Sequence, residues 1–303
     1  MRAFTAAAIQ IAPVKGPLSP GGVLANLEKC VDWLTRCVEA TGAELVVLPE
    51  TATTGFTPAC SPEELWDLVS ALPGPVIAPI QAAAATLGVH VCVGTYERGR
   101  ERGVVYNASA LIGPEGSLLG VYRKTHPFCS ETRARGGWVT AGDEVCVVDT
   151  DLGRIGMMIC FDGDYPEVAR IQAVQGAEVI CRPSALLRSA DIWELTSRAR
   201  AYDNHVFVIG ANATGVDAGG QLYFGNSHIV TPIAHIVAKA ATQESWVCSR
   251  LDPDEALGSL TPGSSVGHGF DHLADRNLDL TRRYREDLER PAASSFPHLN
   301  IGS

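Results

Sequence analysis

Short continuous apolar runs alternate with segments of helical spacing along most of this chain, and this alternation constrains the fold more than any other feature. Such a run is typical of a strand buried on both faces, and the helical segments supply the crossovers that parallel strands need. The pattern therefore predicts a layered α/β protein. Strands are expected at 6–11, 44–48, 89–95, 106–112, 117–123, 154–159, 179–181, 206–211, 227–230 and 235–238, and helices at 25–40, 75–87, 166–175 and 192–204.

The order of these elements occurs twice along the chain. Gly42–Thr51 resembles Gly176–Ala185, and His90–Gly94 resembles His205–Gly210, with a hairpin following in each half. Self-similarity of this kind indicates two copies of one structural unit. We therefore predict a four-layer α-β-β-α sandwich with an internal pseudo-twofold repeat and a functional site between the two halves.

Composition narrows the class of protein. Of the 303 residues, 46% are hydrophobic, as in a globular chain, and the formal net charge of −10 argues against a nucleic-acid partner. No stretch approaches a membrane-spanning length, and the first ten residues fit a β-strand better than a secretory signal, so no membrane partner is expected. The nine cysteines are scattered without CxxC spacing, which is typical of a reducing, cytoplasmic location and indicates no metal site.

Cys160 stands at the end of a predicted strand, shortly before Pro166, which is expected to open a helix. Ligands bind at this edge of α/β sheets, and the positive end of a helix can lower the pKa of a thiol. A buried structural thiol is the alternative. The strand-end position and the polar turn that follows favour a nucleophile.

Two further polar residues follow predicted strands. Glu50 comes after the run 44–48 and Pro49, where partial desolvation would raise the pKa of its carboxyl toward that of a general base. Lys124 ends the second strand of a hairpin, and a fixed ammonium there could stabilise a developing oxyanion. Taken singly, each residue is more simply explained as a capping acid or a solvated lysine.

Together, these segments resemble the nitrilase superfamily of carbon–nitrogen hydrolases, whose members use a Glu-Lys-Cys triad. Leu48–Thr51 resembles the glutamate motif of that family, Tyr122–His126 its lysine motif and Ile159–Glu167 its cysteine motif. Arg198–Asn204 is similar to a further family helix, and Asp275–Leu280 to its C-terminal stretch in degraded form. The resemblance covers most of the chain and implies an enzyme of the amidase or carbamoylase branch.

The resemblance also implies roles for individual residues. Cys160 would be the nucleophile, Glu50 the base that later activates water, and Lys124 the oxyanion donor, assisted by the backbone N–H of Phe161. Glu131 best matches a second glutamate that orients the substrate or tunes the lysine. A thioester on Cys160 would form and break without a cofactor or a metal ion.

Besides Phe161, three residues are expected to bind the substrate: Asp164, Arg182 and Ser184. N-carbamoyl-D-amino-acid hydrolases typically carry two arginines where this chain has Gly163 and Asp164, so Asp164 would repel a carboxylate and favour a neutral or cationic amide. Arg182 could bind a carboxylate or a carbonyl group, or it could pair with Asp164. Ser184, which the repeat equates with Glu50, would line the pocket.

The leading hypothesis is cleavage of a small-molecule amide to a carboxylic acid and ammonia. An N-carbamoyl amidohydrolase and a nitrilase are the alternatives within the family, and a non-catalytic scaffold is disfavoured because no triad residue is missing. We expect one hydrolase domain over residues 1–260. The resemblance implies that the tail, 261–303, packs on a partner subunit in a homodimer or larger homo-oligomer.

Overall fold

Two six-stranded sheets dominate the computed structural model, which describes residues 1–14, 18–258 and 271–290. In spatial order the first sheet contains β14 (Ser245–Leu251), β1 (Phe4–Gln10), β2 (Leu45–Val47), β3 (His90–Arg98), β4 (Val105–Ile112) and β5 (Leu118–Arg123). The second contains β13 (Ile236–Lys239), β12 (His228–Val230), β9 (Phe207–Asn212), β8 (Val179–Ser184), β7 (Gly153–Met157) and β6 (Val147–Thr150).

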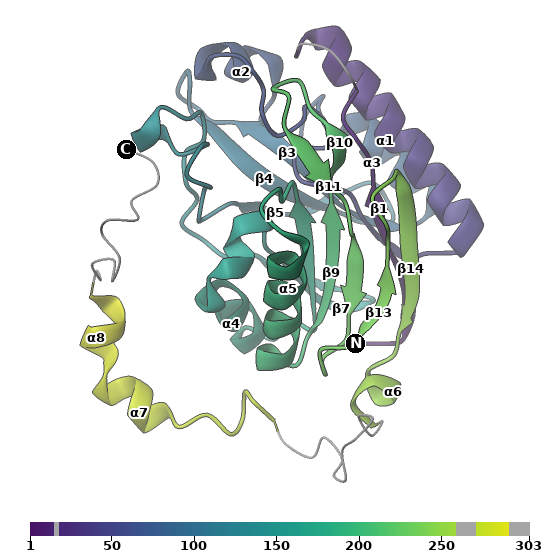
Figure 1. Ribbon diagram of the computed structural model, residues 1–303. Coiled ribbons are helices and arrows are strands. Elements are labelled where there is room, and N and C mark those ends of the chain that lie inside the picture. Colours follow the sequence, from purple (N-terminus) through teal and green to yellow (C-terminus); the bar gives the residue numbers. More distant parts are fainter. Residues whose placement is uncertain (15–17, 259–270, 291–303) are drawn as a thin grey trace.

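Helices cover the outer faces of the two sheets. These are α1 (Pro20–Thr41) and α3 (Ala78–Leu87) on the first sheet, and α4 (Pro166–Val174) and α5 (Ala190–Asn204) on the second. The strands lie between the two helix pairs (Figure 1), so the predicted α-β-β-α sandwich is confirmed. The remaining elements are α2 (Pro62–Leu68), β10 (Thr214–Val216), β11 (Leu222–Phe224), α6 (Pro253–Gly258), α7 (Leu278–Arg283), α8 (Arg285–Glu289) and the 3-10 turns η1 (Arg133–Arg135) and η2 (Cys160–Asp164).

The two sheets share one topology. In the first, β14 and β1 are antiparallel, β1, β2 and β3 are parallel, and β4 and β5 complete an antiparallel meander. In the second, β6, β7, β8, β9, β12 and β13 pair in the same order and with the same senses. The predicted repeat therefore holds strand for strand, with β2 equivalent to β8.

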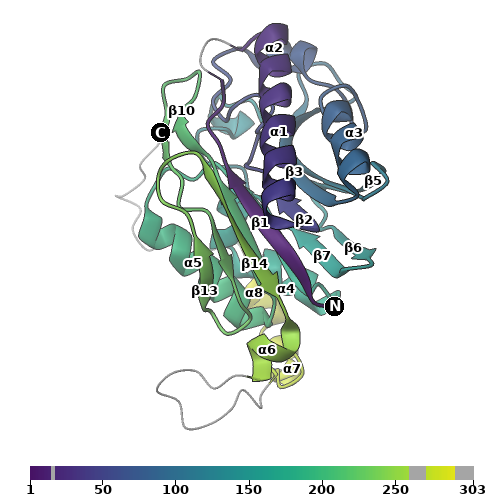
Figure 2. The same cartoon turned by 90° about the vertical axis from the view of Figure 1, so that its right-hand side faces the viewer.

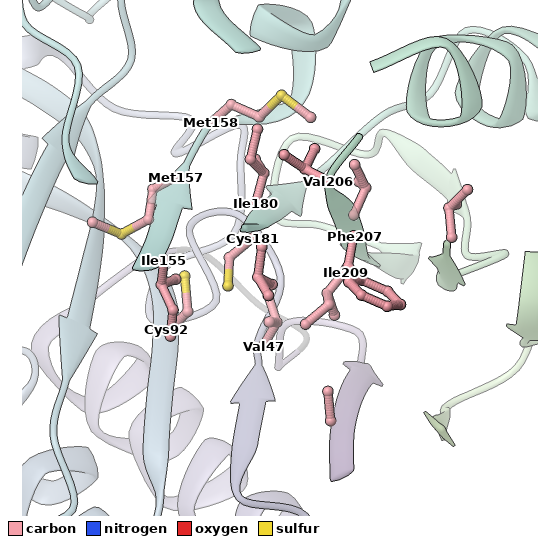
Figure 3. Close-up of a cluster of buried hydrophobic side chains, with 14 of the residues drawn as sticks. Val47, Cys92, Ile155, Met157, Met158, Ile180, Cys181, Val206, Phe207 and Ile209 are labelled. Carbon is pink, nitrogen blue, oxygen red and sulfur yellow. The ribbon is translucent and has the colours of Figure 1, made fainter. Parts of the chain in front are cut away.

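Alternate side chains of each strand serve different cores. Ala7 and Ile9 of β1 pack with the side chains of α1 and α3, whereas Ala6 and Ala8 belong to the core between the sheets. Because both faces of the central strands are covered, their sequences are apolar at consecutive positions, which explains why the apolar runs predicted them. Figure 3 shows part of the core between the sheets, which includes Val47, Cys92, Ile155, Met157, Cys181 and Ile209.

Helix α1 begins earlier than residue 25, where the apolar spacing placed its start. Ser19 caps the helix by accepting a hydrogen bond from the backbone N–H of Gly22, and Pro20 takes a first-turn position that suits its fixed φ. The first turn was missed because its glycines have no apolar side chain to extend the periodic pattern. Gly42, with φ of 64°, ends the helix in the left-handed conformation that glycine adopts readily.

Strands β6 and β14 and helix α2 were not predicted. β14 pairs with β1 along its whole length, from Phe4 opposite Leu251 to Gln10 opposite Ser245, and the two run side by side in Figure 2. β14 lies at the sheet edge and exposes part of its side chains, so it has no continuous apolar run. It nevertheless completes the first half of the sandwich with residues from the far end of the sequence.

The proposed boundary at residue 260 and the tail, 261–303, stay predictions, as do the oligomer and the cytoplasmic location. Residues 259–270 and 291–303 lie outside the described residues. Helices α7 and α8 lie away from the sandwich (Figure 1). In the part of the chain that the structure describes, none of the helices has both the length and the apolar character needed to cross a bilayer.

The backbone around Glu50 depends on a glycine of the neighbouring strand. A Cβ atom at Gly94 of β3 would lie 2.5 Å from Cα of Glu50 and 2.6 Å from the carbonyl oxygen of Pro49. We expect Gly94→Ala to displace the Glu50 loop and to lower the free energy of unfolding by about 1–3 kcal/mol, measured by urea denaturation. Gly21→Ala is the control, because nothing lies closer than 4.0 Å to its Cβ. Equal stability of the two variants would contradict this packing argument.

Candidate active site

A buried lysine joins two buried glutamates where the halves of the sandwich meet. Lys124 follows β5, and its Nζ donates to Oε1 of Glu50 at 2.7 Å and to Oε2 of Glu131 at 2.6 Å. None of the three side chains is exposed to solvent. The structure thus brings together three of the residues that the sequence singled out, although Glu50 and Lys124 are 74 positions apart.

Attraction to the two glutamates keeps Lys124 charged despite its burial. Burial alone would lower the pKa of Lys124, but the negative charges of Glu131 and Glu50 outweigh it and raise that pKa well above its ordinary value. The pKa of Glu131 is raised, mainly by burial and also by repulsion from Glu50, while Lys124 opposes the rise. Lys124 is therefore a fixed ammonium at neutral pH.

Neutral donors hold both glutamates in place. Nδ2 of Asn107 on β4 donates to Oε1 of Glu50 at 2.7 Å and to Oε1 of Glu131 at 3.1 Å. The backbone N–H of Ala185 donates to Oε2 of Glu50 at 2.6 Å, and that of Phe128 to Oε2 of Glu131 at 3.1 Å. The sequence marked Asn107 only as the start of a hairpin, since an asparagine on an apolar strand carries no signature of its partners.

Cys160 occupies the first position of the 3-10 turn η2, after β7. Its φ of 46° lies in the left-handed region that L-residues rarely adopt, and its relative exposure is 6%. The expected lowering of the thiol pKa is wrong. Burial and the charge of Glu50 raise that pKa above its ordinary value, and the opposing charges of Lys124 and Arg182 do not compensate. Cys160 is thus a thiol at neutral pH.

Asp162, two residues after Cys160, links the turn η2 to the loop that begins at Lys124. Its Oδ2 accepts from the hydroxyl of Tyr122 at 2.8 Å and from the backbone N–H of Ile159 at 2.9 Å. Its Oδ1 accepts from the backbone N–H of His126 at 3.0 Å. The bonds from Tyr122 and His126 cross from the first half of the sandwich to the second, so Asp162 helps to fix the position of Cys160 relative to Lys124.

A small apolar pocket opens onto Cys160. Its volume is about 10 Å³, which is close to the space of one water molecule. The rings of Phe128 and Phe161 meet edge to face with centroids 5.2 Å apart, and the ring of Phe56 lies 5.5 Å from Nζ of Lys124. The lining residues are Phe56, Phe128, Cys160, Phe161, Ala185, Leu186, Leu187 and Arg188.

A larger cavity, of about 650 Å³, contains none of these residues. It is lined among others by Glu97, Tyr106 and Arg123, whose side chains point to the opposite face of the strands from their neighbours Asn107 and Lys124. Glu50 lines a second narrow pocket of about 10 Å³, and Phe56 lines both this pocket and the one at Cys160.

The expected substrate-binding residues take different positions. Asp164 does not line the pocket; it forms a two-point ion pair with Arg188, at 2.8 Å for each contact, and Arg188 is the residue at the pocket wall. The expectation missed this pair because Arg188 comes from the loop after β8. Phe161 lines the pocket as expected, although the prediction concerned its backbone N–H.

Neither of the two roles considered for Arg182 is found. Its Nε and Nη2 donate to the carbonyl oxygen of Cys160 at 3.1 and 2.7 Å, and its side chain is fully buried away from the pocket. Ser184 is also buried, and its hydroxyl donates to the carbonyl oxygen of Arg182 at 3.3 Å. Arg182 and Ser184 are two residues apart on β8, so their side chains share the face of the strand that packs against α5 and do not line the pocket at Cys160.

Residues 5–255 match the family described as carbon-nitrogen hydrolase. Omega-amidase NIT2 from Homo sapiens is 31% identical over 218 residues, which cover 70% of this chain and 77% of that relative.

Solved structures share the same fold. A carbon-nitrogen hydrolase from Helicobacter pylori G27 has a TM-score of 0.77 and 25% identity, and the match covers 95% of this chain and 99% of that one. An amidase from Nesterenkonia sp. has a TM-score of 0.75 and 22% identity over 93% of this chain and 96% of its own. A variant of the amidase from Nesterenkonia sp. AN1 carries the acetamide moiety of fluoroacetamide covalently on its active-site cysteine.

The contacts of Asp162 predict a large loss of stability when its charge is removed. In Asp162→Asn one of the two oxygens becomes an amide that faces backbone or hydroxyl donors. We expect the free energy of unfolding in urea to fall by about 2 kcal/mol, because buried hydrogen bonds to charged groups are strong. Asp149→Asn, which breaks an exposed ion pair with Arg154, should change it by less than about 1 kcal/mol. Similar losses in both variants would show that the buried hydrogen bonds of Asp162 contribute no more to stability than an exposed ion pair does.

Proposed function

The chain belongs to the carbon–nitrogen hydrolase family, and on this premise we propose that it is a cysteine-dependent amidase that converts a small linear amide to a carboxylic acid and ammonia. The observation that carries the proposal is the buried ammonium of Lys124, held between Glu50 and Glu131 beside the thiol of Cys160. Amides resist hydrolysis because their carbonyl carbon is a poor electrophile and their nitrogen a poor leaving group, and this arrangement can address both difficulties.

The first half-reaction would form a thioester. Sγ of Cys160 attacks the amide carbonyl carbon while its proton passes to Glu50. Oε2 of Glu50 accepts a single hydrogen bond from the described residues, from Ala185, and so retains a lone pair for this proton. Glu50 then returns the proton to the amide nitrogen as the C–N bond breaks, and ammonia leaves.

Lys124 would stabilise the negative charge that develops on the substrate oxygen. Two of its three N–H donors are used by Glu50 and Glu131, so the third can donate to the oxyanion. Because these partners fix the ammonium before the substrate arrives, little reorganisation is needed during the reaction. Glu131 would thus act by holding Lys124.

The second half-reaction would return the free enzyme. Glu50 takes a proton from water, whose oxygen attacks the thioester carbon. The C–S bond then breaks, Cys160 regains a proton and the carboxylic acid leaves. Every step uses side chains of this chain, and water is the only co-reactant.

The pocket supports an uncharged acyl group. Its walls are mainly phenylalanine and leucine side chains, and the charge of Arg188 at its edge is neutralised by Asp164. Because its volume is about 10 Å³, the aromatic side chains must shift to admit even a small amide. The name of the human omega-amidase supports an amide substrate, and the acetamide moiety on the Nesterenkonia cysteine supports a cysteine that acts as a nucleophile.

The proposal is tested by ammonia release from a substrate panel. The panel contains neutral aliphatic and aromatic amides, ω-amides that carry a carboxylate, N-carbamoyl amines and nitriles. We expect the highest kcat/KM on a small neutral amide, and intact-protein mass spectrometry after an acid quench should show the acyl group on the wild-type enzyme. Cys160→Ala should abolish both signals. Activity on nitriles or N-carbamoyl amines without activity on amides would overturn the proposal.

Replacement of Glu131 tests its proposed hold on Lys124. Glu131→Gln keeps a carbonyl oxygen but removes one of the two charges that fix the ammonium. We expect kcat to fall by about 10–100-fold with a smaller change in KM, because the loss concerns the transition state. Glu97→Gln is the matched control: Glu97 is also buried and pairs with Arg123, but on the other face of the strands. Equal kcat values in the two variants would contradict the role of Glu131.

A further inference from the structure

Arg182 is a buried cation without a buried counter-charge. All of its guanidinium contacts are with neutral acceptors: the carbonyl oxygen of Cys160, the hydroxyl of Thr196 at 2.9 Å and that of Ser197 at 2.8 Å. Among the described residues no carboxylate forms an ion pair with it. Burying an unpaired charge is costly, so a stabilising interaction elsewhere must offset the cost.

The surrounding residues pack closely around this guanidinium group. On one side, Cζ of Arg182 lies 4.5 Å from the ring centroid of Trp193. On the other, a Cβ atom at Gly163 would lie 2.2 Å from Cζ, so only glycine leaves enough room there. Gly210, the partner of Arg182 across β8 and β9, in turn leaves space for the Trp193 ring. The fold therefore accommodates the arginine at three separate positions.

In this position the guanidinium of Arg182 donates two hydrogen bonds to the backbone carbonyl group of Cys160. A left-handed φ, as at Cys160, costs a non-glycine residue roughly 1–2 kcal/mol. The two hydrogen bonds from Arg182 hold the carbonyl group of this same residue, and they therefore oppose relaxation of the turn. The orientation of Sγ follows from that of the backbone that carries it.

The electrostatics of Arg182 are also directed at Cys160. Burial lowers the pKa of Arg182 to about 10, which still leaves it charged at neutral pH, and the strongest opposing influence is the negative charge that Cys160 can carry. Conversely, the charge of Arg182 lowers the pKa of the thiol, against the larger effects of burial and Glu50. The counter-charge that the resting protein lacks would thus appear when Cys160 gives up its proton.

We propose that Arg182 is a positioning residue for Cys160, which locks the left-handed turn through the Cys160 carbonyl group and keeps a positive charge behind the nucleophile. The inference rests on the proposed function in that it takes Cys160 as the nucleophile. It goes beyond that function because it assigns part of the reactivity to a residue outside the pocket and outside the Glu-Lys-Cys triad.

Two substitutions separate the charge from the geometry. Arg182→Met removes the charge and both hydrogen bonds, whereas Arg182→Lys keeps a charge but cannot make the forked contact. Arg200→Met is the control: Arg200 is also buried and donates to the carbonyl groups of Gly163 and Asp164 in the same turn, but not to that of Cys160. Thermal unfolding and circular dichroism establish that each variant is folded.

Two readouts are used on the full chain. The first is kcat and KM on the best amide of the panel. The second is the rate at which iodoacetamide alkylates Cys160, followed by peptide mass spectrometry between pH 6 and 10. The alkylation rate reports on the thiol whether or not the amide substrate has been identified.

For Arg182→Met we expect kcat to fall at least about 100-fold with little change in KM, as for loss of a preorganised electrostatic contact. The alkylation profile should move upward by about one pH unit, which corresponds to a tenfold smaller thiolate fraction. Arg182→Lys should lose kcat but retain most of the alkylation profile. Arg200→Met should lose stability and keep both kcat and the profile.

A folded Arg182→Met variant with native kcat and a native alkylation profile would overturn the inference. If this variant does not fold, Gly163→Ala gives the same test, because its Cβ displaces the guanidinium without removing it. A wild-type protein that hydrolyses none of the amides would contradict the proposed function alone, since the alkylation profiles would still decide the role of Arg182.

Discussion

The site depends on the burial of one ammonium group between two carboxylates. Glu50 comes from the loop after β2, Lys124 and Glu131 come from the loop between β5 and η1, and each charge would be costly to bury alone. Their mutual attraction is strong only where water is excluded, and water is excluded only where both sheets and the loops around Phe56 and Phe128 close together. The cluster and the sandwich therefore stabilise each other, and Asn107, which donates to both carboxylates, completes the network.

The same burial sets the state of the nucleophile. Because Cys160 is desolvated and faces Glu50, its thiol keeps its proton at rest, so the site does not hold a preformed thiolate. This favours a reaction in which deprotonation accompanies attack and Glu50 serves as acid and base in turn. Lys124 and Arg182 both place a buried positive charge near Cys160, and neither of them lines the pocket.

The edge of the pocket at Cys160 carries a pair of charged residues that neutralise each other. Asp164 alone would disfavour a carboxylate, and Arg188 alone would attract one, but their ion pair leaves the edge of the pocket without net charge. The rings of Phe128 and Phe161 pack against this pair and complete the apolar wall. The charge of either residue alone therefore does not predict the net charge at the edge of the pocket.

The layered fold, the repeat and the strand-end positions of three residues, Glu50, Lys124 and Cys160, could be predicted from the sequence alone. The reason is that burial on both faces of a strand, and the change from strand to loop, both produce local patterns in the sequence. The sequence could not determine the partners of Asn107, Asp162, Arg182 and Arg188, nor the edge strand β14. Those depend on contacts between segments far apart in the chain, and on which face of a strand a side chain occupies. The thiol pKa belongs to the same group: a helix that follows the cysteine is visible in the sequence, whereas the desolvation that outweighs it arises only when the two sheets pack together.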